Sequence, residues 1–219
     1  MMAEIHDKHI RPVKERSDLH ISRKIFHNLG IISILVVYHN LSYQNAIQLS
    51  FVMTAAILTF DFLRLKTKFF SDVAHRTFRR VMRENEMNSW SATTHLMLGV
   101  TTVILIFPRE VATLAVGMLA FGDPISSIVG VLYGKDKILG NKSLQGTMAG
   151  FAICSIVAAL FYYSKGLMLE RIVLVSILSG LIGAISELVP VGKMDDNFSF
   201  PILAATMLYI LFLLFGGFS

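Results

Sequence analysis

The sequence is poor in cysteine, tryptophan and charged residues. One cysteine and one tryptophan occur among 219 residues, and Asp, Glu, Lys and Arg together make up 16%. The single Cys154 cannot form an internal disulfide and fits no zinc-binding spacing, so we expect a small buried apolar residue. The HExxH, CxxC and GxSxG patterns are absent, which excludes the common metalloprotease, redox and hydrolase classes.

Long apolar runs occupy most of the chain instead. Hydrophobic residues make up 54% of it, and its mean hydropathy is +0.62. Because about 20 apolar residues cross a hydrocarbon core of about 30 Å, we predict an all-α, polytopic integral membrane protein. Its polar N-terminal segment covers 1–24, and a single transmembrane domain covers 25–219. The domain has about seven transmembrane helices, at 25–40, 45–63, 91–107, 110–133, 147–164, 170–190 and 198–216.

The basic residues predict the orientation of these spans. Lys and Arg gather before the first span, between the second and third, and in the loop after Gly134, whereas the opposite side has Arg109, Lys165 and Arg171. The positive-inside rule then places the N-terminus in the cytoplasm and the C-terminus on the other side. The polar start predicts no cleavable signal peptide. A net charge of +5 spread over juxtamembrane segments indicates topology and lipid bilayer contact, and no nucleic-acid binding.

The connection between the second and third spans has the pattern of an amphipathic helix, at about 66–88. Apolar residues such as Phe69 and Phe70 recur at helical spacing, and the arginines from Arg76 to Arg83 gather on the other face. We interpret this segment as a cytoplasmic interfacial helix on anionic headgroups. The alternative is that one of its arginines reaches a phosphate site.

One carboxylate, Asp123, interrupts an apolar span. An ionisable residue at the centre of a membrane helix costs about 2.5–3.5 kcal/mol on insertion scales, so such residues usually have a function.

A glycine and lysine loop follows directly, at 134–147. Its glycines allow backbone N–H groups to approach phosphate oxygens, and Ser143 and Thr147 lie where the next helix begins, so that its positive end faces an anion. The spacing is not that of a P-loop. The alternative is a loop that is rich in lysine for topological reasons alone.

A second group of acidic residues is predicted on the same side. Glu187 ends the sixth span, and Asp195, Asp196 and Asn197 precede the seventh. Adjacent carboxylates with an amide suit a divalent ion such as Mg²⁺, which keeps substrate phosphates in its coordination shell. The alternative is a polar turn that caps a helix. The topology allows all these residues to converge with Asp123 on one cytoplasmic pocket.

These motifs together resemble a known family. The runs are Gly122-Asp123-Pro124-Ile125-Ser126-Ser127, Lys142-Ser143-Leu144-Gln145-Gly146-Thr147, Glu187-Leu188-Val189-Pro190 and Asp195-Asp196-Asn197, with Arg23-Lys24-Ile25-Phe26-His27 near the start. In this order they resemble the signature of the CTP-dependent lipid-alcohol kinases, which include dolichol kinase, phytol kinase and yeast-type diacylglycerol kinase. The resemblance covers about 21–203.

The resemblance implies transfer of the γ-phosphoryl group of CTP to the hydroxyl of a membrane lipid, with a divalent cation. The domain at 25–219 would then be catalytic. One departure is Gln145, where the family usually has Glu, and an amide there can bind a ribose, a base or a backbone group. One alternative is a CDP-lipid synthase. Such synthases carry a His-Gly-Gly segment, and this chain has no His-Gly pair. The other alternative is a non-catalytic transporter or scaffold.

As a hypothesis for the mechanism, we assign Mg²⁺ to Asp123 with Asp195 or Asp196. A carboxylate, Asp196 or Glu187, would accept the proton of a lipid hydroxyl that enters between spans at headgroup depth. The remaining candidates would bind the nucleotide and its phosphates: Gly122, Gly134, Lys135, Lys142, Ser143, Gly146, Thr147 and Asn197, supported by Arg23, Lys24, His27 and Arg83.

Overall fold

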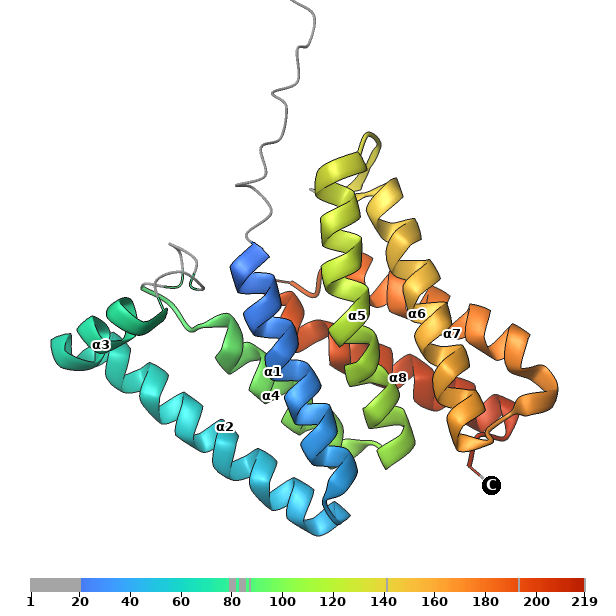
Figure 1. Cartoon of the computed structure of the whole chain (residues 1–219), viewed down its shortest axis with the longest axis horizontal. Helices are drawn as coiled ribbons and strands as arrows, with labels where there is room; N and C mark the ends of the chain where they lie inside the picture. Colours follow the sequence, from blue (N-terminus) through green and yellow to red (C-terminus); the bar gives the residue numbers. More distant parts are fainter. Residues whose placement is uncertain are drawn as a thin grey trace, which may run out of the picture.

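The computed structural model describes residues 21–78, 82, 86, 88–140, 142–192 and 194–218, with side chains from Lys24 onward. Within these residues the chain is built from helices (Figure 1). They are α1 (Ile21–Asn40), α2 (Tyr43–Lys66), α3 (Lys68–Phe78), α4 (Ala92–Ile106), α5 (Arg109–Tyr133), α6 (Leu144–Lys165), α7 (Ile172–Leu188) and α8 (Asp196–Phe215). A short 3-10 helix, η3 (Leu169–Arg171), precedes α7, and the strands β1 (Lys137–Leu139) and β2 (Lys142–Ser143) form an antiparallel hairpin between α5 and α6.

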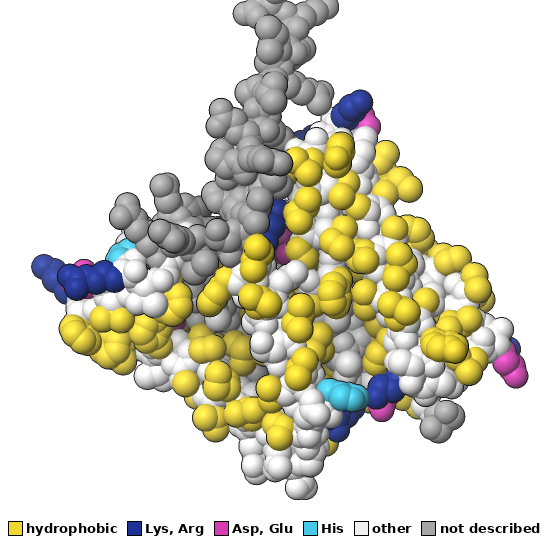
Figure 2. All heavy atoms as spheres, in the orientation of Figure 1, with side chains coloured by type: hydrophobic (Ala, Val, Ile, Leu, Met, Phe, Trp, Pro, Cys, Tyr) yellow, Lys and Arg dark blue, Asp and Glu magenta, His cyan; other side chains and the backbone are white. Residues whose placement is uncertain are grey.

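Five stretches of the described chain are long and apolar enough to cross a membrane. They are α2, α5, α6, α8 and the stretch Leu169–Leu188, whereas α4 is apolar but only 15 residues long. Hydrophobic side chains cover the sides of the molecule, and charged side chains gather toward the ends of the helices (Figure 2). The all-α membrane fold is therefore confirmed. The predicted number of seven spans stays a prediction.

Small residues bring α5 and α6 into close contact. On α5 they are Gly122, Ser126 and Gly130, one turn apart. A Cβ atom on Gly146 of α6 would lie 2.8 Å from the backbone oxygen of Ser126, and one on Gly122 would lie 2.6 Å from Sγ of Cys154. Stripes of small residues allow such close helix packing inside membranes, where dispersion contacts replace the hydrophobic driving force. This packing holds the β hairpin at the shared end of α5 and α6 (Figure 1).

The helices α1 and α2 meet at the turn after Asn40 and diverge toward their other ends (Figure 1). At the turn, Arg109 of α5 donates hydrogen bonds to the backbone oxygens of Tyr38, His39 and Leu41, the last two at 3.1 and 2.8 Å. Its guanidinium also lies 5.1 Å from the centre of the Tyr38 ring. A cation beside the last carbonyl groups of a helix is favourable, and Arg109 thereby fastens the end of α1 to α5.

The short helix α3 extends sideways from the end of α2 (Figure 1) and has basic side chains on one face and hydrophobic side chains on the other (Figure 2). Phe69 is 72% exposed, and the ring of Phe78 lies 6.2 Å from that of Phe26 on α1. The helix covers the first half of the predicted interfacial helix at 66–88. Its position at a membrane surface stays a prediction, and Arg83 lies outside the described residues.

A buried ion pair connects the end of α2 to the start of α4. Arg64 Nε donates to Asp61 Oδ1 at 2.7 Å, and the other Asp61 oxygen accepts hydrogen bonds from the backbone N–H of Ser91 and the hydroxyl of Thr94. Arg64 also donates to the backbone oxygen of Ser89 at 2.7 Å. The carboxylate and the guanidinium thus each make several hydrogen bonds, which a buried charge needs to offset its loss of hydration.

Candidate active site

Lys142 lies at the centre of the candidate site. Its Nζ atom is 3.2 Å from Oδ2 of Asp196 at the start of α8, and 3.7 Å from Oε1 of Glu187 near the end of α7. It also donates a hydrogen bond to the backbone oxygen of Glu187. The Lys142 side chain is 25% exposed and that of Glu187 is 11% exposed, whereas that of Asp196 is 55% exposed. One ammonium group therefore joins three elements and remains accessible from outside.

The β hairpin holds Lys142 in this position. Ser143, directly after it, is the N-cap residue of α6, and its hydroxyl accepts a hydrogen bond from the backbone N–H of Gly146 at 3.3 Å. Gly134 allows the approach of Ser143, because a Cβ atom there would lie 2.6 Å from its Oγ atom. Gly140 has a φ of +55°, in the left-handed region that glycine adopts most easily.

Gln145 fastens the first part of this loop. Its Oε1 atom accepts a hydrogen bond from the backbone N–H of Lys135 at 3.0 Å, and its Nε2 atom donates to Oδ2 of Asp136 at 2.8 Å. The amide thus binds the backbone, one of the partners that the sequence left open for it. Where Gln145 stands in place of Glu, it supplies a donor that a carboxylate lacks.

Asp123 lies on α5 next to this cluster. The charges that act on its carboxylate are those of His27 and Lys24 from α1, Lys142 from the hairpin and Asp196 from α8. Three segments that are distant in the sequence thus act on the one acid in the middle of an apolar helix. The convergence of Asp123, Lys142, Glu187 and Asp196 follows the arrangement expected from the topology. Their chemical roles stay predictions.

Two polar atoms of the site are buried without a hydrogen-bond partner among the described residues. They are Oε2 of Glu187 and the hydroxyl oxygen of Thr147 in the first turns of α6. Leaving a buried polar group unsatisfied costs about 1–3 kcal/mol, so both atoms are suited to a ligand. The Ser126 hydroxyl is close enough to interact with the Glu187 carboxylate. Sequence reasoning gave Ser126 no role, although it stands one turn after Asp123.

The two adjacent aspartates at the start of α8 have different surroundings. Asp195 is the N-cap residue, and its Oδ1 atom accepts hydrogen bonds from the backbone N–H and the side-chain amide of Asn197 at 2.9 and 2.7 Å. Asp196 instead faces Lys142. The helix-cap interpretation therefore holds for Asp195, and Asp196 is the aspartate that joins the cluster.

The residues in place suit a magnesium ion that is bound partly by a nucleotide. Within the described ranges, no three His, Cys, Asp or Glu side chains lie close enough to form a metal site by themselves. Mg²⁺ is commonly held by one or two carboxylates together with water and substrate phosphates. Asp123 and Asp196 provide such carboxylates, so the predicted ion is compatible with the site and stays a prediction.

The other predicted site residues divide into three groups. Lys24 and His27 face Asp123, as described. The glycines Gly122, Gly134 and Gly146 make close packing contacts in this structure, and Lys135 is exposed between α5 and β1. The Arg23 side chain lies outside the described residues, as does Arg83. Any contact of these groups with a nucleotide stays a prediction.

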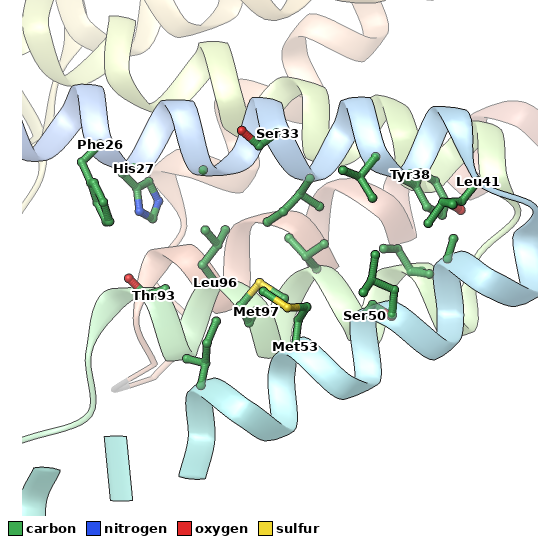
Figure 3. A pocket seen from close by; sticks show the side chains of 18 residues that line it. Phe26, His27, Ser33, Tyr38, Leu41, Ser50, Met53, Thr93, Leu96 and Met97 are labelled. Atoms are coloured by element: carbon green, nitrogen blue, oxygen red, sulfur yellow. The ribbon is translucent and has the colours of Figure 1, made fainter. Parts of the chain in front are cut away.

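An apolar cavity of about 350 Å³ reaches the same end of the bundle. It lies between α1, α2 and α4, and its walls include Leu49, Met53, Met97 and Val100. His27 points toward it at one end, and Tyr38 and Leu41 lie at the other (Figure 3). Hydropathy alone gave no sign of this cavity, because it arises from the divergence of α1 and α2.

The fold and the site together define a class of protein. It is an integral membrane protein of helices that gathers carboxylates, a lysine and unsatisfied polar atoms at one end, beside an apolar cavity. Such a site suits a reaction between a water-soluble anion and a membrane lipid.

Comparison with known proteins defines the family. No family model matches the chain, and no solved structure matches it. The chain is 31% identical over 206 residues to CTP-dependent diacylglycerol kinase 1 of Schizosaccharomyces pombe. The aligned region covers 87% of this chain and 93% of that protein. The proteins of the same name are 25% identical in Saccharomyces cerevisiae and 26% identical in Eremothecium gossypii, covering 84% and 86% of this chain and 71% and 66% of theirs. The chain therefore belongs to the CTP-dependent lipid kinase family of transferases, as its motifs predicted.

Proposed function

We propose that this protein transfers the γ-phosphoryl group of CTP to the hydroxyl of a membrane lipid, and that diacylglycerol is the first substrate to test. The observation that carries the proposal is the position of Lys142 between Glu187 and Asp196, next to Asp123. Diacylglycerol comes first because three relatives are named CTP-dependent diacylglycerol kinases. Polyprenols such as dolichol and phytol-like alcohols present a hydroxyl to the same groups and belong in the same panel.

The chemistry is an in-line displacement at phosphorus. The lipid hydroxyl oxygen forms a bond to the γ-phosphorus, the bond from that phosphorus to the bridging oxygen breaks, and CDP leaves with the electron pair. Phosphoryl transfer asks a protein mainly for positioning and for neutralisation of charge on the phosphate oxygens. Lys142 supplies a positive charge on the accessible side of the cluster, and Thr147 supplies a hydroxyl that has no partner within the described part of the chain.

We propose that Glu187 accepts the proton of the lipid hydroxyl. Its Oε2 atom is buried and makes no hydrogen bond to the described residues, while the Ser126 hydroxyl acts on the carboxylate, so a lone pair remains available for the proton. Asp196 is less suited, because it is the most exposed acid of the cluster and is paired with Lys142. Asp123 and Asp196 would hold Mg²⁺, which neutralises phosphate charge when it is bound.

The basic residues support an orientation for the active site. The hairpin, Lys24 and the cluster lie at one end of the bundle, and the positive-inside rule favours the cytoplasm for this end. We propose that the N-terminus and the active site face the cytoplasm and that the C-terminus lies on the opposite side.

Isotope position distinguishes the two enzymatic candidates. Purified protein in detergent is incubated with Mg²⁺ and CTP labelled either at the γ- or at the α-phosphate, together with diacylglycerol, a polyprenol or phosphatidate. A lipid kinase transfers the γ-label to the alcohol and leaves the α-label in CDP. A CDP-lipid synthase transfers the α-label to phosphatidate and releases the γ-label in pyrophosphate. Transfer of the α-label alone would refute the proposed function.

A further inference from the structure

The apolar cavity between α1, α2 and α4 is about as long as one half of a bilayer is thick. His27 and Tyr38 mark its two ends along α1 (Figure 3). At 1.5 Å per residue, the helix between them is about 16 Å long. The hydrocarbon core of a bilayer is about 30 Å thick. The cavity is therefore about as long as one leaflet of a bilayer is thick, which is the length that a lipid chain occupies there.

One end of the cavity lies at the turn after α1, and the other end lies toward the candidate active site. The far end lies at the turn where Arg109 binds the last carbonyl groups of α1 and stacks on Tyr38. At the near end, His27 lines the cavity and is also one of the groups whose charge acts on Asp123. Phe78 of α3 contacts Phe26 beside this opening. The apolar space and the surroundings of Asp123 thus share His27.

We propose that a hydrocarbon chain of the substrate lipid lies in this cavity, with its hydroxyl beside His27 and Asp123. This inference rests on the proposed function and adds the place where the lipid is recognised. The walls are suited to hydrocarbon because leucine, methionine, valine and isoleucine side chains dominate them. The length of the cavity therefore limits how much of a lipid chain lies inside the protein.

Two adjacent valines on α1 provide a matched pair of variants. Val36 and Val37 are both exposed, but only Val37 lines the cavity. Val37→Phe fills the far part of the cavity, whereas Val36→Phe adds the same bulk to another side of the same helix. A third variant, Gly30→Leu, fills the near part, because a Cβ atom at Gly30 meets no other atom within 4 Å. Leucine also favours a helix more than glycine does.

The readout is the ratio of KM for dioleoylglycerol to KM for dioctanoylglycerol. We expect Val37→Phe to increase this ratio about tenfold, because the longer chain loses its apolar contacts and the shorter one does not reach them. Val36→Phe should keep the ratio within a factor of two. Gly30→Leu should raise KM for both lipids. Equal ratios in Val36→Phe and Val37→Phe, in a protein that phosphorylates both lipids, would overturn the inference and leave the proposed function intact.

A direct measurement covers the case in which no phosphoryl transfer is found, which would refute the proposed function. Diacylglycerol with a diazirine at the end of one chain is irradiated with the protein, and the labelled peptides are identified. We expect labels in α1, α2 and α4 near Tyr38 and Leu41, and loss of these labels in Val37→Phe. Labelling confined to the outer faces of α6 and α7 would overturn the cavity assignment whatever the activity.

Discussion

Replacing Lys142 with methionine tests the electrostatic centre of the site. The change removes the cation that lies 3.7 Å from Glu187 and 3.2 Å from Asp196. Two unit charges 3.7 Å apart interact by about 4 kcal/mol at an effective dielectric constant of about 20. Water screens this interaction in part, since Lys142 is 25% exposed, and the pair with the more exposed Asp196 is worth about 1 kcal/mol or less. Protonation of Glu187 offsets some of the loss, so we expect the variant to fold with a slightly lower melting temperature.

The effect on catalysis should be larger than the effect on stability. Removing one group that stabilises charge in a transition state typically lowers kcat by about 10²–10³-fold. We therefore expect Lys142→Met to lower kcat for γ-phosphoryl transfer by that factor and to raise KM for CTP, whereas Lys142→Arg should keep more activity. Lys165→Met is the control, because it removes an exposed lysine at the other end of α6. A folded Lys142→Met protein with more than about one tenth of wild-type kcat would refute the reasoning.

Three further predictions concern the support of the site. Gln145→Glu places a second carboxylate beside Asp136 and removes a hydrogen-bond donor, so the amide hydrogens of the hairpin should exchange faster. Adding Asp136→Asn should reverse this increase. An unchanged exchange rate in Gln145→Glu would contradict the role of Gln145. Gly146→Ala pushes a Cβ atom to 2.8 Å from the Ser126 oxygen and should cost about 1–3 kcal/mol, measured by thermal unfolding in detergent; an unaltered midpoint counts against the close α5–α6 contact. Glu187→Gln should lower kcat by about 10²–10⁴-fold without changing the Mg²⁺ dependence, and a raised Mg²⁺ requirement would instead identify Glu187 as a metal ligand.

Hydropathy predicted the helical architecture well because apolar runs end at clear signals. The predicted span at 110–133 corresponds to α5, Arg109–Tyr133, and the span at 198–216 to α8, Asp196–Phe215. Glycines follow both helices, and Gly216 has the left-handed backbone of a helix C-terminus. The hairpin was not predicted, since strands of three and two residues leave almost no periodic pattern.

The sequence indicated which residues belong to the candidate site, but it did not indicate which of them contact one another. Charge and topology predicted Asp123, Lys142 and Glu187 on one side, because Lys142 and Glu187 lie next to or near a span end and Asp123 lies in the half of its span that leads to Gly134. They could not distinguish Asp195 from Asp196, since one residue of helix rotation decides which carboxylate caps α8 and which faces Lys142.

The glycines of the signature show a second limit of sequence reasoning. Gly122, Gly134 and Gly146 were predicted to approach a nucleotide, and in the structure each makes room for a neighbouring protein atom. A glycine pattern indicates that some atom comes close, but the packing decides whether that atom belongs to a helix or to a ligand. The tight α5–α6 contact positions Ser143 and therefore Lys142, so these glycines influence the site through its scaffold.

The most direct test is γ-phosphoryl transfer by Asp123→Asn. Asparagine keeps the size of the side chain and removes its negative charge. This is the charge that interacts with four other residues of the site: His27, Lys24, Lys142 and Asp196. With γ-labelled CTP, diacylglycerol and Mg²⁺, we expect the wild-type protein to label the lipid, and a folded Asp123→Asn protein to lose at least about 10²-fold in kcat. Wild-type rates in the folded variant would contradict the assignment of phosphoryl transfer to this cluster.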